Sequence, residues 1–286
     1  MSARPTARSR PDRCPGVLRP WPADDGALVR IRLVGGELPS SSLAGLAAVA
    51  HRYGDGEVHL TGRANLQLRG LPFVDGRLPD AVVDAIAATG LLPSRSHERA
   101  RNVMVSPASG ISGGRADLRG TARELDRLLC ADPGLAALPG RFLFVLDDGR
   151  GDLAERDADL GCVALDTSSV QVRVGSRGWG PTVSVTDLPA TLVDLARRFL
   201  SRRGQGPAAA WHVDELTTPL LDLGAPDRSA LVATPALPYG PGPAGDHVAV
   251  PEGRLDAPTV RDLTARGDLL VVTPWRGILL PAAEAA

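Results

Sequence analysis

The clearest indication of the fold comes from residues 58–69, which read Val58-His59-Leu60-Thr61-Gly62-Arg63-Ala64-Asn65-Leu66-Gln67-Leu68-Arg69. Its pattern predicts two strands, 58–61 and 65–69, joined by a corner at 62–64. Side chains at alternate strand positions share one face, which here would carry four polar residues: Arg63, Asn65, Gln67 and Arg69. Such a face is costly to bury unless it meets an anionic or hydrogen-bonding partner. The other interpretation is the solvent face of an amphipathic strand.

The flanking sequence extends this pair of strands to half of a ferredoxin-like sandwich. Residues 28–34 alternate apolar and charged side chains, as a half-buried strand does. A helix is expected over about 39–50, where apolar residues fall at helical spacing, and a second over 79–89. The order is therefore β-α-β-β-α.

The end of the chain repeats this beginning. Residues 247–250 match the first strand, 253–256 match 36–39, and 258–265 match the first helix. Residues 269–273 and 276–280 then match the two strands around the corner. Two copies around a middle segment predict a pseudo-twofold fold in which two half-sheets complete each other. The alternative is chance similarity between short β-α-β stretches.

The middle of the chain has strand and helix patterns of its own. Strands are expected at 141–146, 163–165 and 170–174, and helices at about 121–129 and 187–202. The fold class is therefore α+β, with two ferredoxin-like half-units flanking an α+β domain. We expect a disordered tail (1–13), a first half-domain (14–78), a middle domain (79–204) and a second half-domain (205–286).

Composition excludes several classes of function. The formal net charge is -1, so no basic field draws the protein to nucleic acid. No apolar run approaches the ~20 residues of a membrane span, and the first 13 residues lack the apolar segment of a secretory signal. A cytoplasmic protein is expected. Lysine is absent, so all 32 basic residues are arginine, a side chain suited to binding carboxylates.

Cysteine and histidine give no metal signature. The 3 cysteines, Cys14, Cys130 and Cys162, lie far apart and are expected to be reduced thiols. His97, His212 and His247 have no second histidine or carboxylate at metal-ligand spacing, so no metal site is predicted.

Two motifs in order resemble a known superfamily. Thr61-x-Arg63-x-x-x-Gln67, followed after a helix by Arg101-Asn102-Val103, is similar to the nitrite and sulfite reductases, which hold sirohaem. Further motifs resemble the precorrin-3B synthases of cobalamin biosynthesis, a branch of that superfamily, over about residues 14–280: Cys14-Pro15-Gly16, the stretch from Leu138 to Asp152, Trp211-His212 and Thr273-Pro274-Trp275-Arg276.

The resemblance implies a tetrapyrrole-binding surface. It assigns Arg63 and Arg101 to the tetrapyrrole, which is precorrin-3A as substrate or a sirohaem-like macrocycle. Two lysines that donate protons in the reductases correspond to Arg141 and Leu143, which argues against six-electron reduction of sulfite or nitrite. We expect the carboxylates of the macrocycle to be bound or oriented by Arg63, Asn65, Gln67, Arg69, Arg101, Asn102 and Arg141.

The implied activity is that of an oxidoreductase of the monooxygenase type. Precorrin-3B synthases carry out an oxygen-dependent ring hydroxylation with lactone formation, and a 4Fe-4S cluster feeds the electrons. The four cluster cysteines of the family come as two pairs downstream of the second half-unit, and this sequence has none there. A cluster-bearing partner protein and an electron donor are therefore expected, and no catalytic residue is assigned. The alternatives are a non-catalytic tetrapyrrole-binding protein, a truncated sirohaem-type reductase homologue and a decayed gene product.

Overall fold

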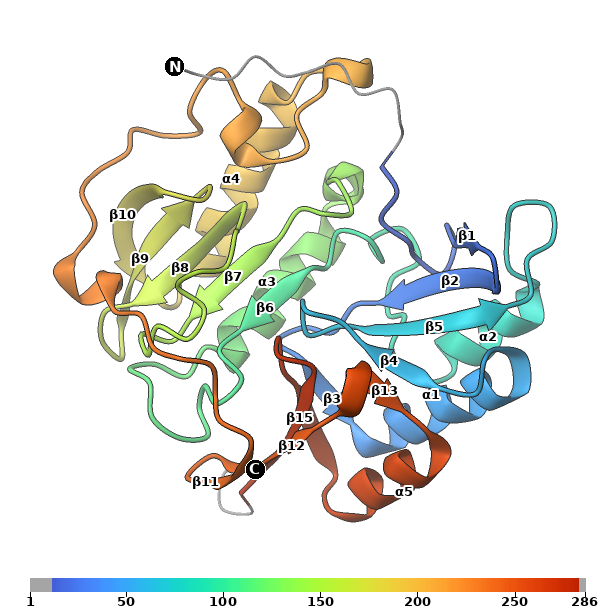
Figure 1. Ribbon diagram of the computed structural model, residues 1–286. Helices are drawn as coiled ribbons and strands as arrows, with labels where there is room; N and C mark the ends of the chain where they lie inside the picture. The colour runs from blue at the N-terminus through green and yellow to red at the C-terminus, as the bar shows by residue number, and fades with distance from the viewer. Residues whose placement is uncertain (1–11, 283–286) are drawn as a thin grey trace. The chain divides into compact units, whose positions relative to one another are not determined.

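The chain forms two compact units, each of which gathers distant parts of the sequence. The structure is a computed structural model that describes residues 12–282. One unit, the repeat unit, consists of residues 14–98 together with the described residues from 237 onward. The other, the middle unit, consists of 99–236 and the described residues before 14. In Figure 1 the repeat unit therefore carries both blue and red segments, whereas the middle unit runs from green to orange.

The first copy in the repeat unit follows the expected order, with short strands added. Its helix α1 begins directly after Pro39, and apolar side chains at helical spacing, Leu43, Leu46 and Ala50, are buried. The elements are β1 Trp21–Ala23, β2 Gly26–Ile31, β3 Glu37–Pro39, α1 Ser40–Tyr53, β4 Val58–Leu60, β5 Leu66–Leu71 and α2 Asp80–Ala87.

The second copy has the same order without a final helix. Asp256 caps its helix, since the Asp256 side chain accepts a hydrogen bond from the Thr259 amide. The elements are β11 Gly240–Gly242, β12 Gly245–Ala249, η5 Pro251–Gly253, β13 Arg254–Leu255, α5 Ala257–Ala265, β14 Leu269–Val272 and β15 Gly277–Pro281.

The two copies exchange one strand each. Sheet A has the order β1-β2-β5-β4-β13 and sheet C the order β11-β12-β15-β14-β3. Strand β13 of the second copy thus pairs with β4 of the first, and β3 of the first pairs with β14 of the second, both antiparallel. The prediction of two half-sheets that complete each other is confirmed, as is the α+β class.

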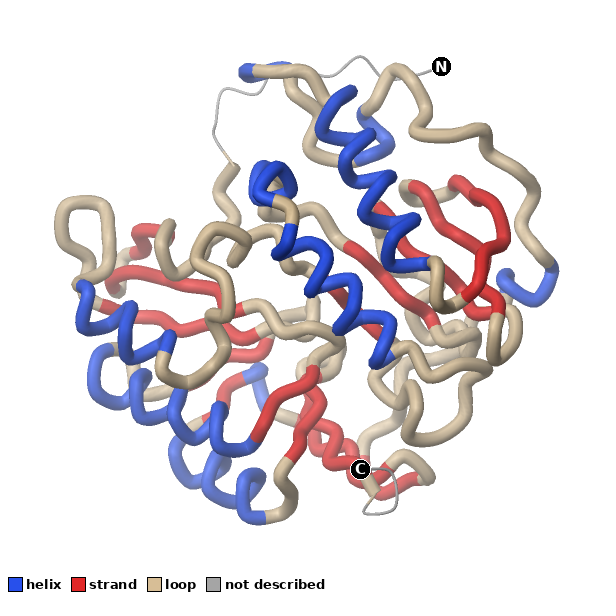
Figure 2. The backbone as a smooth tube through the Cα atoms, turned by 180° about the vertical axis from the view of Figure 1, so that it is seen from behind, coloured by secondary structure: helices blue, strands red, loops and turns tan. Residues whose placement is uncertain are grey.

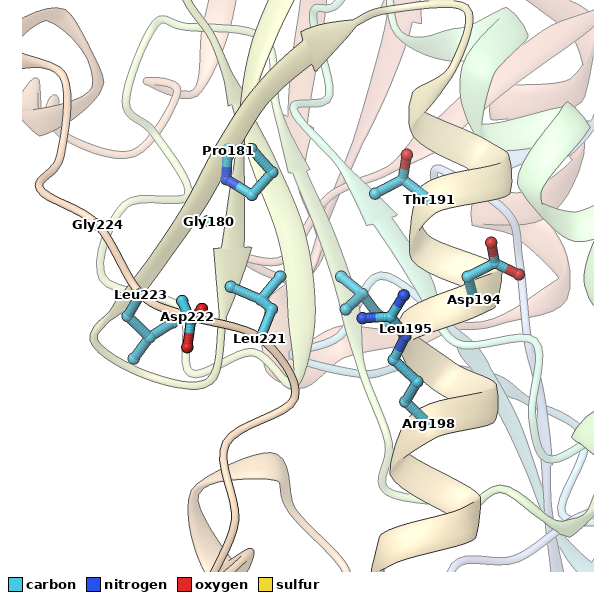
Figure 3. A pocket seen from close by; sticks show the side chains of 10 residues that line it. All are labelled: Gly180, Pro181, Thr191, Asp194, Leu195, Arg198, Leu221, Asp222, Leu223 and Gly224. Carbon is cyan, nitrogen blue, oxygen red and sulfur yellow. The ribbon is translucent and has the colours of Figure 1, made fainter.

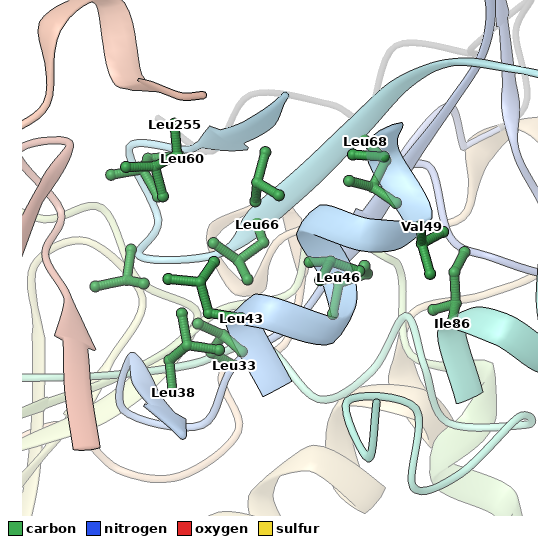
Figure 4. Close-up of a cluster of buried hydrophobic side chains, with 14 of the residues drawn as sticks. Leu33, Leu38, Leu43, Leu46, Val49, Leu60, Leu66, Leu68, Ile86 and Leu255 are labelled. Atoms are coloured by element: carbon green, nitrogen blue, oxygen red, sulfur yellow. The ribbon is translucent and has the colours of Figure 1, made fainter. Parts of the chain in front are cut away.

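One apolar core joins both copies (Figure 4). Leu43 and Leu46 of α1 pack with Leu66 and Leu68 of β5, and all four are fully buried. Leu255 of the exchanged strand β13 belongs to the same core. Burial of each such side chain contributes about 1.5–3 kcal/mol, so the core ties the second copy to the first.

The middle unit is a mixed sheet with helices on one face. Sheet B has the order β10-β9-β8-β7-β6; β6, β7 and β8 are parallel, and β9 and β10 add antiparallel. Helices α3 and α4 lie side by side along it (Figure 2). The elements are β6 Val103–Val105, α3 Arg119–Ala131, η1 Pro133–Ala137, β7 Phe144–Asp147, β8 Leu160–Ala164, β9 Ser169–Val174, β10 Gly178–Ser184, α4 Leu188–Arg202, η2 Gly206–Ala208, η3 Val213–Glu215 and η4 Arg228–Leu231.

The limits of the units differ from the expected domain limits at 78/79 and 204/205. Helix α2 stays in the repeat unit because Val82 and Ile86 join its core. Residues 205–236 stay in the middle unit, where the Gln171 side chain bonds Ala225 O and Asp227 N. Strands β6 and β10 were not expected, and β7 begins at Phe144 rather than at Arg141. Most of the expected tail, residues 1–13, lies outside the described residues.

Within residues 12–282, no helix has the length and apolar character that a membrane span requires.

Candidate functional site

The corner between β4 and β5 fixes Arg63 at the tip of a tight turn. The Thr61 amide donates to Asn65 O at 2.9 Å, and the Thr61 hydroxyl oxygen accepts from the Asn65 amide at 3.2 Å. Ala64 takes a left-handed conformation, φ 53°, which completes the turn. The threonine of the Thr61-x-Arg63 motif thus shapes the backbone that presents the arginine.

A row of polar residues crosses sheet A beside this corner. Arg254 of β13 pairs with His59 of β4, His59 pairs with Gln67 of β5, and Gln67 pairs with Arg30 of β2. Directly opposed residues in a sheet hold their Cβ atoms about 5 Å apart on one face. We call these four residues the polar row. It contains Gln67, as the sequence predicted, and Arg30, which was not among the predicted site residues.

Arg30 is a partly desolvated cation in this row. Its side chain is half-buried, its Nε is buried without a hydrogen-bond partner, and within residues 12–282 it forms no ion pair. Burial lowers the pKa of Arg30; the Cys14 thiol opposes this shift, and the positive charge of Arg63 adds to it. A desolvated guanidinium beside a second one is stabilised by a carboxylate. The alternating stretch 28–34 was the available signal, but alternation alone indicates only a strand.

The loop that precedes sheet A, residues 14–18, is held beside β2 by hydrogen bonds. The Glu98 carboxylate accepts from the amides of Val17 at 2.5 Å and Leu18 at 2.9 Å. Arg32, 3% exposed, donates through Nη1 to Pro15 O and to Glu98 O, both at 3.2 Å. These bonds place the Cys14-Pro15-Gly16 motif beside β2, which explains the electrostatic influence of Cys14 on Arg30.

The remaining two predicted residues of this strand have partners inside the fold. Asn65 is 1% exposed, and its Oδ1 accepts from the Leu33 amide at 2.9 Å. Arg69 donates through Nε to Asp25 Oδ2 at 3.0 Å in an ion pair that is largely in solvent. Asn65 therefore stabilises the corner, and Arg69 is engaged at the far end of β5.

The predicted residues of the middle unit lie where β6 and β7 begin. Arg101, 6% exposed, makes a bidentate bond to Asp126 of α3 at 2.6 and 2.8 Å. Asn102 Nδ2 donates to Gly140 O and Phe142 O at 3.4 and 3.3 Å. Both side chains thus hold this edge of sheet B together. Arg141 is half-buried and lies near Asp159, whose pKa burial raises to about 6.

Comparisons with known proteins agree with this architecture. Residues 22–75 match the nitrite/sulfite reductase ferredoxin-like half domain, a stretch that contains Arg30, Thr61, Arg63 and Gln67. A precorrin-3B synthase of Sinorhizobium sp is 34% identical over 166 residues, which cover 56% of this chain and 34% of the relative. A ferredoxin–nitrite reductase of Leptolyngbya laminosa is 34% identical over 122 residues, covering 40% and 23%.

The fold is also found in a solved structure, that of the Mycobacterium tuberculosis NirA protein. The TM-score is 0.70 at 19% identity, over 91% of this chain and 54% of that one. This chain therefore spans 34% and 23% of the two curated relatives and 54% of the NirA protein. Residues 22–75 are thus similar to the half domain of the nitrite/sulfite reductases, this chain is similar to precorrin-3B synthase and ferredoxin–nitrite reductase relatives, and it shares the fold of the NirA protein.

Proposed function

We propose that this chain is the tetrapyrrole-binding part of a precorrin-3B synthase-like oxidoreductase. The observation that carries the proposal is the guanidinium of Arg30, which is half-buried, has no ion pair within residues 12–282 and lies next to Gln67 and Arg63. A reduced tetrapyrrole carries acetate and propionate groups around its rim. Arginine forks bind such groups by paired, charge-assisted hydrogen bonds.

The proposed substrate is precorrin-3A, which undergoes oxygen-dependent hydroxylation and lactone formation. One atom of O2 enters the ring and the other leaves as water, so two electrons must come from a donor. The role of Arg30, Arg63 and Gln67 is to bind and orient the macrocycle. The relative named precorrin-3B synthase, 34% identical over more than half of this chain, supports this choice.

Six-electron reduction of nitrite or sulfite is the second candidate, because ferredoxin–nitrite reductases are also among the relatives. The environment of Leu143 argues against it. Leu143 is 4% exposed and packs with Met104 and Val145 in an apolar cluster, so this position offers no proton. Arg141, the other candidate donor position, has a guanidinium in place of the ammonium of a lysine.

The cysteines of this chain do not fit a 4Fe-4S cluster. Cys14 lies in the repeat unit and Cys130 and Cys162 in the middle unit. Cys162 is fully buried, and burial raises the pKa of its thiol, whereas a cluster binds thiolates. We therefore propose that any cluster and its electron donor are supplied from outside these 286 residues.

The proposal is tested by a visible-absorbance titration of the purified chain with precorrin-3A and with sirohaem. We expect saturable binding, weakened about 10- to 100-fold in Arg30→Ala, because a lost charged hydrogen bond costs about 1.5–3 kcal/mol. Arg63→Ala should weaken binding in the same direction. Turnover of precorrin-3A with added reductant separates the synthase from a non-catalytic binding protein.

Arg69→Ala is the matched control, since it removes an arginine of the same strand that is already paired with Asp25. It should bind as tightly as the parent chain. Absence of binding by the parent chain, or equal loss in Arg69→Ala and Arg30→Ala, would overturn the assignment.

A further inference from the structure

Three segments of the middle unit converge on one histidine. Asp157 lies in the loop before β8, Ser176 in the turn between β9 and β10, and His212 and Asp214 at the start of η3. One ligand atom from each of Asp157, His212 and Asp214 lies within 4.8 Å of the others. Sequence spacing gave no such indication, because the fold brings Asp157 to His212 from a distant part of the chain.

The side chain of His212 is buried and incompletely bonded. The side chain is 11% exposed, and its Nε2 is buried without a hydrogen-bond partner within residues 12–282. That atom lies 3.5 Å from Asp157 Oδ1 and 3.8 Å from Oδ1 of Asp159. Nδ1 accepts from the Asp214 amide at 3.1 Å and lies 3.6 Å from Asp214 Oδ2. A buried ring nitrogen thus points at carboxylate oxygens without bonding them.

The hydroxyl of Ser176 has two acceptors for one proton. Its Oγ lies 2.7 Å from Asp157 Oδ1 and in equally direct contact with Asp214 Oδ2. A serine hydroxyl can donate to one of them at a time. The other carboxylate oxygen then faces a lone pair, an arrangement that a positive charge between the two carboxylates would relieve.

Three carboxylates surround the His212 ring. Asp157 and Asp214 face it from the surface, and Asp159 lies behind His212 with 1% exposure. Two arginines lie near these carboxylates: Arg141 acts on Asp159, and the Asp157 carboxylate raises the pKa of Arg173 against the larger effect of burial. Among residues 12–282, Arg173 forms no ion pair with this group of carboxylates.

We propose that Asp157, His212 and Asp214 bind one divalent cation of the zinc class. An imidazole nitrogen with two carboxylates is a donor set that such ions take, with a remaining position for water or the Ser176 hydroxyl. Coordination through Nε2 moves the ring proton to Nδ1, so the hydrogen bond that Nδ1 accepts from the Asp214 amide is given up when the ion binds. The ion would thus connect three segments: the loop before β8 through Asp157, the turn after β9 through Ser176, and the start of η3 through His212 and Asp214.

A second group with the same donor types supplies an internal control. Asp55, Glu57 and His59 also place three ligand atoms within 4.8 Å. There the histidine is satisfied, since His59 Nε2 bonds Asp55 Oδ2 at 2.7 Å, and Glu57 is paired with Arg254 at 2.6 Å. We expect this group to bind no ion comparably.

The test is a calorimetric titration of the full chain, stripped with a chelator, with Zn²⁺, together with visible spectra of Co²⁺. We expect one ion per chain, with affinity lowered at least about tenfold in His212→Ala, since even loss of an outer partner costs that much. His59→Ala should bind like the parent chain, and Mg²⁺ should not compete, because it disfavours nitrogen ligands.

Asp157→Asn keeps the test decisive if His212→Ala does not fold. The Asp157 side chain is 67% exposed, so its replacement should leave the fold intact while weakening binding. The proposal is overturned if the parent chain binds no Zn²⁺, or if binding survives both His212→Ala and Asp157→Asn. Loss of binding in His59→Ala alone would move the site to the other group.

Discussion

The turn between β4 and β5 and the turn between β14 and β15 occupy equivalent places in the two copies of the repeat unit. In the first, Thr61 N bonds Asn65 O and Ala64 is left-handed. In the second, Thr273 N bonds Gly277 O at 2.9 Å and Arg276 is left-handed, φ 61°. Each threonine hydroxyl oxygen also accepts from the amide four residues later.

The rows of side chains beside these turns differ. The polar row of sheet A, Arg254-His59-Gln67-Arg30, corresponds in register to Glu37-Val271-Leu279-His247 of sheet C. Arg30 and Gln67 are half-buried, whereas Leu279 and His247 are both 1% exposed. His247 Nε2 lies 3.0 Å from the Thr273 hydroxyl, and the Tyr239 ring covers it at 4.5 Å.

The difference separates what the two copies share from what only the first copy has. The threonine and the left-handed residue preserve the turn in both copies, so neither identifies a binding site by itself. At the position of Arg30 the second copy has a histidine whose partners all lie inside the protein. Among residues 12–282, the charged Arg30 of the first copy has no such partner, and our proposal therefore locates the ligand at that copy.

The largest expected effect on stability is at the two glycines that precede the exchanged strands β3 and β13. Gly36 and Gly253 are both left-handed, φ 76° and 70°. A Cβ on Gly36 would lie 2.3 Å from Val272 O, whereas one on Gly253 would lie 3.1 Å from Leu60 O. Urea unfolding should show a loss of more than about 3 kcal/mol for Gly36→Ala and about 1–2 kcal/mol for Gly253→Ala. Equal losses would mean that the two exchanges are packed alike.

The next largest effect on stability is at His247 of sheet C, which occupies the position that Arg30 has in sheet A. His247→Ala removes a buried ring with hydrogen bonds and an aromatic contact, and should cost about 3 kcal/mol of unfolding free energy. Arg30→Ala removes a desolvated charge that has no ion pair in the described part of the chain, and should stay within about 1 kcal/mol of the parent chain. Both are measured by urea unfolding. A larger loss in Arg30→Ala would assign Arg30 to stability instead of binding.

A smaller effect follows from the pKa of His247. Burial lowers it below the ordinary value of 6.5, so in the interval below 6.5 the unfolded chain binds the proton more readily. The contribution of the neutral His247 ring to the free energy of unfolding is therefore complete above pH 6.5, and it is lost as the pH falls below 6.5. Between about pH 7.5 and pH 5, His247→Gln should lose less stability than the parent chain.

Two carboxyl groups of the middle unit change stability with pH in the opposite direction, and comparing His247→Gln with the parent chain removes their effect. Burial raises the pKa of Asp152 and Asp159 to about 6, so they favour the folded state at low pH in both proteins. An unchanged pH dependence in His247→Gln would show that the ring titrates alike in the folded and unfolded chain.

The smallest effect is expected at Arg69. Its ion pair with Asp25 is largely exposed, and such pairs contribute between about 0 and 1 kcal/mol. Thermal unfolding of Arg69→Ala should therefore match the parent chain closely. A clear loss would indicate that the end of β5 depends on this contact.

Much of the fold follows from local pattern, and the strand exchange does not. The helices and the strands around both corners have their expected periodicities, because burial of one face requires them. Strand β13 has two residues and β3 three, too few for a periodic signal. Their pairing depends on contacts between distant positions such as Leu38 and Leu270.

The site was predictable in part, for the same reason. The motif residues Arg63 and Gln67 lie at the corner and in the polar row, and their binding role remains a prediction. Alternation could not show that Asn65 accepts from the Leu33 amide, and the Arg101-Asn102-Val103 motif could not show that Arg101 bonds Asp126. Nor could it distinguish Arg30 from Arg32, which shares its strand pattern but bonds the carbonyls of Pro15 and Glu98.

Hydrogen exchange of the chain with and without precorrin-3A tests most directly whether the first copy binds the macrocycle. Bound macrocycle should slow exchange in β2, in β5 and at residues 61–65, and leave β12 and β15 unchanged. Slowed exchange confined to β12 and β15, or no change in either copy under saturating macrocycle, would contradict it.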